Sequence, residues 1–268
     1  MKLHFISGLP RSGSTLLSAV LRQNPRFHAD VTSPVRSLLA TLLPAMSDEE
    51  FAPVINDAFR QRVLRAVLEA AHGARSQAVV FDTHRLWTAH LPLLAELYPG
   101  SRVICCVRDV GWILDSVERM LALNPTRTSG IFKFQRLDSV YQRAEMMMSP
   151  GGGFVGVPLT TLREAWFSRF AGSLVVVPYS QLTQQPERTL HALYEALGEP
   201  WFEHDLEALS FDAPERDEVL GMPGLHHVRA RLQADDRAPG IPPDLFQRYA
   251  TAQFWQQPQQ NPNGVIVL

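Results

Sequence analysis

A short loop near the start of the chain, Gly8-Leu9-Pro10-Arg11-Ser12-Gly13-Ser14-Thr15, has the residues and spacing to hold a phosphate group. It lies between an apolar run over residues 3–7 and an amphipathic stretch over residues 12–23. Glycine at both ends lets the backbone turn tightly, so that successive N–H groups converge, and the following helix adds its positive amino-terminal end. Three hydroxyls and the charge of Arg11 supply further donors. This context predicts phosphate binding, and a plain strand–turn–helix connection is the alternative.

The loop has the spacing of a Walker A motif, but Ser14 stands where that motif has lysine. A P-loop kinase needs the lysine on the β- and γ-phosphates, and a hydroxyl with an acid to hold Mg²⁺. Its absence favours a donor with fewer charges, such as a sulfuryl group on a nucleotide phosphate, whose transfer does not require a metal. Residues 79–82, Val-Val-Phe-Asp, resemble a Walker B strand ending in a metal-binding acid. A kinase with a degenerate Walker A loop therefore stays open as the alternative.

The loop resembles the 5′-phosphosulfate loop of sulfotransferases that use 3′-phosphoadenosine 5′-phosphosulfate, especially the Pro-Arg-Ser-Gly-Thr-Thr-Leu form of tyrosylprotein sulfotransferases and bacterial relatives. Arg108 and Ser116, eight residues apart, resemble the family's 3′-phosphate signature, and an arginine with a hydroxyl is a normal grip on phosphate. Tyr179-Ser180-Gln181-Leu182 resembles the Tyr-Glu-Asp-Leu segment whose tyrosine contacts the adenine side. The resemblance spans most of residues 3–200. It implies a set of donor-binding residues: Pro10, Arg11, Ser12, Gly13, Ser14, Thr15, Arg108, Ser116 and Tyr179. Arg229 is a further candidate, from a segment that departs from the family's pattern.

Two of these residues also have ordinary structural interpretations. Arg108 can form a salt bridge with Asp109 or Asp115, and Tyr179 can pack at the end of a strand. The family's C-terminal phosphate-binding motif is missing, and the sequence Gly224-Leu225-His226-His227-Val228-Arg229 is the candidate to fold over the 3′-phosphate instead. A metal pair or a surface loop are the alternatives for the two histidines.

The resemblance also implies a general base. Asp82-Thr83-His84-Arg85 follows the second apolar run, where the cytosolic sulfotransferases have Lys-Thr-His and use the histidine as base. With an unperturbed pKa of ~6.5, His84 is mostly neutral at pH 7. Arg11, with Arg85 as a second candidate, takes the charge role of the missing lysine, so the implied catalytic residues are His84 and Arg11. Asp82 either orients His84 or competes with it as base, and an ordinary loop histidine is the alternative for His84.

The tyrosylprotein sulfotransferases place a catalytic glutamate after the first helix. The corresponding stretch, residues 27–33, has no glutamate, and Asp30 and His28 are the nearest substitutes. This weakens protein tyrosine as the acceptor. Residues 124–158, which include Met146 to Met148 and a triple glycine, are expected to shape the acceptor site, although core packing is the favoured role of the methionines.

Four apolar runs, over residues 3–7, 78–81, 102–107 and 174–177, alternate with stretches of helical period. The pattern predicts an α/β fold in three layers, α/β/α, with a central parallel sheet, the P-loop nucleotide-binding fold of the sulfotransferase type. Ser47 and Glu50 predict a capping box at the start of the third helix. One domain over residues 1–268 is expected, with its core in 3–200 and an irregular segment over 201–268, in which 256–263 is a loose tail. Helices are predicted over residues 12–23, 34–43, 48–71, 91–98, 111–123, 132–148, 159–171 and 186–197.

Composition excludes several classes of protein. The net charge of −2 gives no general attraction to nucleic acid, and no run approaches the ~18 apolar residues of a membrane span. Cys105 and Cys106 are adjacent and point to opposite faces of a strand, so neither a disulfide nor a metal site is predicted. The first residues lead directly into the loop, without the apolar core of a signal peptide. We therefore expect a cytoplasmic protein.

The sequence predicts a sulfotransferase that moves a sulfuryl group from 3′-phosphoadenosine 5′-phosphosulfate to an acceptor hydroxyl, and releases adenosine 3′,5′-bisphosphate. No metal is expected. The acceptor class stays open among small molecules, glycans and peptides. Besides the degenerate kinase, a nucleotide-binding module without catalysis is the remaining alternative.

Overall fold

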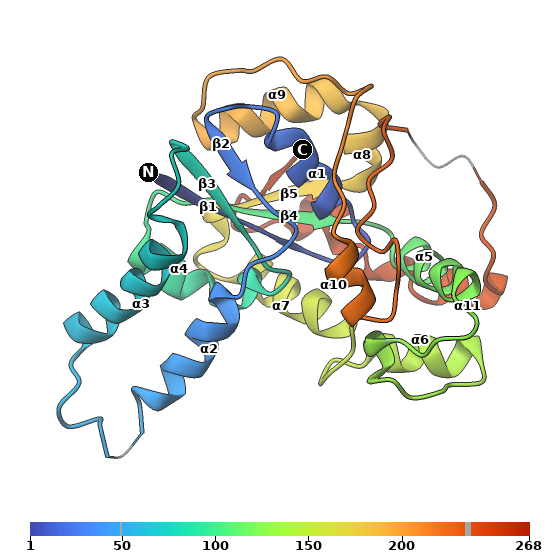
Figure 1. The fold of residues 1–268 in the computed structure, drawn as a ribbon, viewed down its shortest axis with the longest axis horizontal. Helices are drawn as coiled ribbons and strands as arrows, with labels where there is room; N and C mark the ends of the chain where they lie inside the picture. Colours follow the sequence, from blue (N-terminus) through green and yellow to red (C-terminus); the bar gives the residue numbers. More distant parts are fainter. Residues whose placement is uncertain (49, 234–236) are drawn as a thin grey trace.

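The computed structural model of the chain describes residues 1–48, 50–233 and 237–268. Its centre is a six-stranded sheet in the order β2-β3-β1-β4-β5-β6, in which every neighbouring pair is parallel (Figure 1). The strands are β1 Lys2–Gly8, β2 Phe27–Ala29, β3 Val79–Thr83, β4 Val103–Val107, β5 Leu174–Pro178 and β6 Ile266–Val267.

Helices cover both faces of the sheet (Figure 1). The apolar residues of α2, α3, α4, α5, α7 and α11 join one buried cluster, and those of α1, α8 and α9 join the other. The predicted three-layer α/β fold is therefore confirmed. The α-helices are α1 Ser14–Leu21, α2 Val35–Ala45, α3 Asp57–His72, α4 Leu91–Leu97, α5 Val110–Leu123, α6 Val140–Met148, α7 Gly156–Phe167, α8 Tyr179–Gln184, α9 Pro186–Leu197, α10 Pro214–Val219 and α11 Pro243–Arg248.

The four predicted strands all form, with ends shifted by one or two residues. Their alternation is visible in the two cysteines, since Cys105 belongs to one buried cluster and Cys106 to the other. The edge strands β2 and β6 were not predicted. They contain three and two residues, which is too short for a periodic signal.

The predicted start of the third helix is wrong. The helix α3 begins at Asp57, after Asn56, whose Oδ1 accepts the Phe59 N–H at 2.9 Å. The Ser47 hydroxyl instead donates to the Leu43 carbonyl at 2.9 Å, at the end of α2, so it caps no helix start. Asparagine is among the best N-cap residues, because its side chain satisfies an unpaired N–H of the first turn.

Three other predicted segments differ from the structure. The helix expected over 132–148 is divided into a short 3₁₀ turn, η2 Gly130–Phe132, and α6, because Ser139 caps α6 through the Tyr141 N–H at 3.1 Å. The helix expected over 159–171 begins earlier and ends earlier, as α7. The tail over 256–263 leads into β6, which pairs with β5 at the sheet edge.

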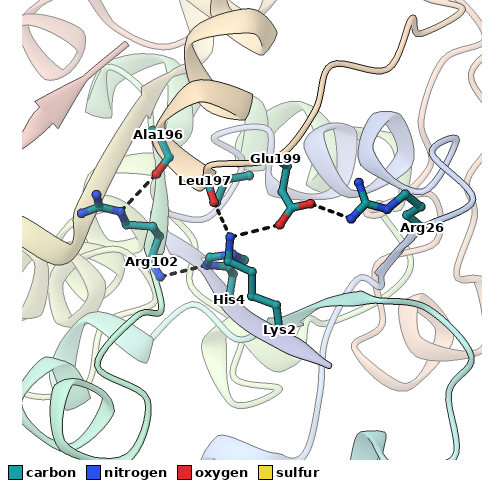
Figure 2. A network of polar contacts seen from close by, with 7 residues as sticks. All are labelled: Lys2, His4, Arg26, Arg102, Ala196, Leu197 and Glu199. Carbon is teal, nitrogen blue, oxygen red and sulfur yellow. Dashed lines mark hydrogen bonds and ion pairs between the residues drawn. The ribbon is translucent and has the colours of Figure 1, made fainter.

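A polar network ties the amino-terminal edge of the sheet to the end of α9 (Figure 2). Lys2 Nζ donates to the Leu197 carbonyl at 2.6 Å and Arg102 Nε to the Ala196 carbonyl at 3.2 Å, so both cations satisfy the last carbonyls of the helix. Glu199 pairs with Lys2 at 3.0 Å, and His4 Nδ1 accepts the Arg102 backbone N–H at 2.9 Å. These contacts stabilise the packing of α9 against the amino-terminal ends of the strands.

The opposite edge collects the carboxyl ends of β1, β3, β4 and β5. In open parallel sheets, ligands bind at this edge because the loops that follow the strands surround it. The helix α10 and the irregular residues 220–233 lie in front of the same edge (Figure 1). Backbone hydrogen bonds hold this irregular segment in place, among them Leu209 N–H to Ala230 O at 2.7 Å and Val228 N–H to Phe211 O at 3.1 Å.

Candidate active site

The loop between β1 and α1 turns through three residues with positive φ, Gly8 (129°), Arg11 (57°) and Gly13 (94°). A Cβ at Gly8 would lie 2.1 Å from the Cys106 carbonyl oxygen, and one at Gly13 would lie 2.9 Å from the Tyr179 ring. Both positions therefore need glycine, because the loop passes directly against β4 and against the tyrosine. The loop is thereby pressed between the ends of β4 and β5.

The predicted loop residues separate into two groups. Pro10, Arg11, Gly13, Ser14 and Thr15 line a cleft at the carboxyl edge of the sheet. Ser12 is buried, and its hydroxyl lies against the Leu9 and Cys106 carbonyls, the second at 2.8 Å. The Ser12 side chain therefore fixes the shape of the loop and does not reach the cleft.

Arg11 and Arg108 connect the loop with the segment that follows β4. Arg11 Nε donates to Ser116 Oγ at 3.1 Å, across 105 residues of sequence. Arg108 donates to the Arg11 carbonyl at 3.2 Å, and its guanidinium lies 4.2 Å from the centroid of the Tyr179 ring. The structure thus brings together Arg11, Arg108, Ser116 and Tyr179, which the sequence placed in three separate motifs.

The two acids that offered Arg108 a structural alternative have other partners. Asp109 caps α5 by accepting the Trp112 N–H at 3.1 Å. Asp115 is buried, pairs with Arg237 and accepts the Gly240 N–H at 2.6 Å. Neither carboxylate is drawn into the cleft by these contacts.

His84 follows β3 and lines the same cleft. Its Nδ1 accepts the Leu86 N–H at 3.2 Å. Burial, followed by the charges of Arg36 and Arg85, lowers the pKa of His84 to about 4. The ring is therefore neutral at pH 7 and carries its proton on Nε2, since Nδ1 is an acceptor.

Asp82 does not orient His84. Its Oδ1 accepts the Trp87 indole N–H at 2.8 Å, and its Oδ2 lies 2.7 Å from His72 Nε2. The carboxylate is buried, with 1% of its surface exposed. The expectation that Asp82 orients or replaces His84 is wrong: it anchors η1 (Trp87–His90) and α3 to the end of β3.

A second histidine reaches the cleft from the C-terminal segment. His226 Nδ1 is hydrogen-bonded to Asp217 Oδ1, and its backbone N–H donates to Asp217 Oδ2 at 3.0 Å. Arg11 also donates to the Leu225 carbonyl, so this segment rests on the loop. Arg229 lines the cleft. Asp217 and Arg216 were not predicted, because nothing in an irregular sequence shows which residues meet in space.

The cleft has a volume of about 470 Å³ and is strongly cationic. Among its described lining residues none is Asp or Glu, although the whole chain has a net charge of −2. Burial, followed by the charge of Arg216, lowers the pKa of Arg85 to about 10. Such a surface favours a polyanionic ligand. The lining arginines are Arg11, Arg85, Arg108, Arg119, Arg216, Arg229, Arg231 and Arg237.

The family model described as "Sulfotransferase family" matches residues 4–203. The chain belongs to this sulfotransferase family. No curated protein sequence matches it significantly. Among solved structures, the sulfotransferase domain from the curacin biosynthetic pathway is similar with a TM-score of 0.57 at 16% identity, over 93% of this chain and 96% of that one.

Two further solved sulfotransferases share the fold. The enzyme from Alicyclobacillus acidocaldarius aligns with a TM-score of 0.51 at 14% identity, over 82% of this chain and 90% of its own. STF9 from Mycobacterium avium aligns with a TM-score of 0.50 at 12% identity, over 100% of this chain and 78% of its own. At such identities the likeness supports the fold of this sulfotransferase and not its acceptor.

Several other residues singled out in the sequence lie outside the cleft. His28 and Asp30 do not line it, and His28 Nδ1 lies 3.3 Å from Arg75. Met147 is buried, and Met146 and Met148 pack against the same cluster, as core methionines do. Within residues 1–48, 50–233 and 237–268, no group of three or more His, Cys, Asp or Glu side chains is placed to hold a metal. No described helix is long and apolar enough to cross a membrane.

Proposed function

We propose that this sulfotransferase transfers a sulfuryl group from 3′-phosphoadenosine 5′-phosphosulfate to an acceptor hydroxyl and releases adenosine 3′,5′-bisphosphate. The observation that carries the proposal is the contact of the loop with Arg108 and Ser116, through Arg11 Nε–Ser116 Oγ (3.1 Å) and Arg108–Arg11 O (3.2 Å). Two anion-binding elements are thereby held side by side, which suits a nucleotide with phosphate at both the 5′ and the 3′ position.

In this arrangement the 5′-phosphosulfate lies on the loop, against Pro10, Gly13, Ser14 and Thr15. Arg108 and Ser116 hold the 3′-phosphate, assisted by Arg229, and Tyr179 contacts the adenine side. As the bond between sulfur and the bridging oxygen breaks, negative charge develops on the departing 5′-phosphate. Loop amides and Arg11 stabilise that charge, as fixed donors do in other transfer reactions. The arginines supply the positive charge, so we propose transfer without a metal.

His84 is the proposed general base. Its pKa of about 4 rises toward the working range of a base when an anionic donor enters the cleft, because opposite charge favours the imidazolium. To take a proton at Nε2, the neutral ring must carry its proton on Nδ1 and release the Leu86 hydrogen bond. That exchange costs about 1 kcal/mol, which is small beside the gain from general base catalysis.

A kinase is disfavoured by Asp82. Both of its carboxylate oxygens are engaged, by Trp87 Nε1 and His72 Nε2, and the group is buried. A Walker B acid must instead face the metal at the phosphates. Ser14 at the position of the Walker lysine points the same way.

Ligand-induced stabilisation tests the donor. Adenosine 3′,5′-bisphosphate at 100 times its Kd adds ~2.7 kcal/mol to the free energy of unfolding. For a chain of this size we expect a rise in Tm of roughly 5–10 °C. The rise should not need Mg²⁺. A shift with ATP and Mg²⁺ alone, or no shift, contradicts the proposal.

A second experiment separates catalysis from a binding module without activity. His84→Ala should keep the Tm shift while transfer to a hydroxyl acceptor falls ~10²–10⁴-fold. The acceptor itself is to be found by screening pools of small molecules, glycans and peptides with labelled donor. Unchanged transfer in the variant removes His84 from the role of base.

A further inference from the structure

Asp217 and His226 form a buried carboxylate–imidazole pair at the edge of the cleft. Asp217 lies in α10 with none of its side chain exposed, and it holds His226 twice, at Nδ1 and at the backbone N–H. The His226 side chain keeps 18% of its surface exposed and lines the cleft. Two contacts from one carboxylate fix both the position and the rotation of the ring.

The carboxylate also decides where the ring carries its proton. An ionised carboxylate only accepts hydrogen bonds, so Nδ1 of the neutral ring must be the protonated nitrogen. The lone pair then lies on Nε2, at the opposite edge of the ring. In the described parts of the chain, no side chain or backbone group forms a hydrogen bond with Nε2 of His226. His84 has the reverse arrangement, since its Nδ1 accepts an N–H and its Nε2 holds the proton.

The pair lies beside the loop proposed to hold the sulfuryl group. Arg11 donates to the carbonyl of Leu225, the residue before His226, and also to Ser116. The charges of Arg216 and Arg11 act on the His226 ring, and the charge of Arg216 acts on His84 as well. Burial, the largest effect, lowers the pKa of His226, so the ring is neutral and able to accept a proton.

We infer that Asp217 and His226 are a second proton-accepting pair for sulfuryl transfer, acting from the C-terminal wall of the cleft. This rests on the proposed function. The acceptor oxygen forms a bond to sulfur, and the bond between sulfur and the 5′-phosphate oxygen breaks with its electron pair on the leaving nucleotide. For an acceptor that reaches the sulfur along the C-terminal wall, the hydroxyl proton passes to His226 Nε2 in place of His84. Asp217 is the positioning residue, and its charge stabilises the imidazolium that forms.

The resting tautomers test the pair without any assay of activity. Long-range ¹H–¹⁵N spectra of the full chain labelled with ¹⁵N-histidine report which ring nitrogen carries the proton. His226 should show protonated Nδ1, and His84 should show protonated Nε2. Asp217→Asn should reverse the tautomer of His226, because the amide accepts the backbone N–H with its oxygen and donates to Nδ1 with its nitrogen. A His226 ring protonated at Nε2 in the unmodified protein overturns the inference.

Kinetics test the role in transfer. Asp217→Asn and His226→Ala should each lower kcat ~10²–10⁴-fold and leave the Kd of adenosine 3′,5′-bisphosphate within about threefold. Added imidazole should restore part of the kcat of His226→Ala. Asp212→Asn is the matched control, because Asp212 is 58% exposed and lies 4.0 Å from His227, and it should keep full kcat.

The outcomes separate this inference from the proposed function. If the unmodified chain neither binds adenosine 3′,5′-bisphosphate nor transfers the sulfuryl group, the proposed function fails while the tautomers still stand as measured. If it does both, three results with His226→Ala each overturn the inference. The first is an unchanged kcat, the second is a loss of kcat that is matched by weaker binding of the nucleotide, and the third is a loss of kcat that added imidazole does not restore in part.

Discussion

Replacing Arg108 by alanine tests which phosphate this arginine holds. Its guanidinium donates to the Arg11 carbonyl at 3.2 Å and lies 4.2 Å from the centroid of the Tyr179 ring. These two contacts orient the guanidinium at the cleft before the ligand arrives. A hydrogen bond to a charged group contributes about 1.5–3 kcal/mol. Arg108→Ala should therefore raise the Kd of adenosine 3′,5′-bisphosphate by ~10–150-fold, since 1.4 kcal/mol is a factor of ten.

Calorimetric titration with two nucleotides makes the test specific. Adenosine 5′-monophosphate lacks the 3′-phosphate, so its Kd should change by less than about threefold in the same variant. Ser116→Ala should show the same selectivity with a loss of about tenfold, at the lower end of that range, because the hydroxyl donates one hydrogen bond to the charged phosphate and carries no charge of its own. An equal loss for both nucleotides refutes the reasoning. Arg108 would then act by supporting the loop through Arg11 and Tyr179, and not by holding the 3′-phosphate.

Three further predictions concern stability and are checked by urea unfolding. Gly8→Ala should lower the free energy of unfolding by ~2–5 kcal/mol, because the new Cβ would lie 2.1 Å from a β4 carbonyl oxygen and the φ of this residue is 129°. The control is Gly100→Ala, which should change the free energy of unfolding by less than ~0.5 kcal/mol, because the described chain, apart from the two neighbouring residues, has no atom within 4 Å of the new Cβ. Asp82→Ala should lower it by ~2–5 kcal/mol, since a buried indole N–H and a buried imidazole lose their acceptor; a loss below ~1 kcal/mol contradicts the anchoring role. The pKa values of His4 and His84 fall to about 4 in the folded chain, so the unfolded chain binds more protons between pH 4 and 6.5. The free energy of unfolding should therefore be highest above pH ~6.5 and should decrease as the pH falls from 6.5 to 4. A free energy of unfolding that stays constant over that pH range contradicts the lowered pKa values.

The sequence was sufficient for the parts of the site that lie in short continuous segments. The loop from Gly8 to Thr15 and the Arg108–Ser116 pair follow strands with strong apolar patterns, so their positions at one edge of a parallel sheet could be inferred. The inward direction of the Ser12 hydroxyl, toward the Cys106 carbonyl, could not be predicted. The direction of a side chain in a loop depends on the backbone angles, and the positive φ of Arg11 (57°) cannot be recognised from the residue type.

Pairs formed across the chain were beyond prediction. Asp82 has the sequence position of a metal-binding acid or of a partner for His84, yet its carboxylate is hydrogen-bonded to His72 and Trp87. The capping box predicted at Ser47 does not form, for a related reason. The helix begins nine residues later, after Asn56, where the apolar residues of α3 join the same buried cluster as those of α2 and α4. Local signals indicate which residues are able to form a contact, and packing selects among them.

The histidines show why burial alone does not mark a catalytic residue. Burial lowers the pKa of His4 and of His84 to about 4 alike, but His4 lies in the stabilising network at the amino-terminal edge of the sheet (Figure 2). The partner of the ring is more informative. Nδ1 accepts an N–H in both His4 and His84, whereas a carboxylate holds the ring in His72 and in His226. Of these two, only His226 lines the cleft, so of these two rings only His226 combines a carboxylate at Nδ1 with a position in the cleft.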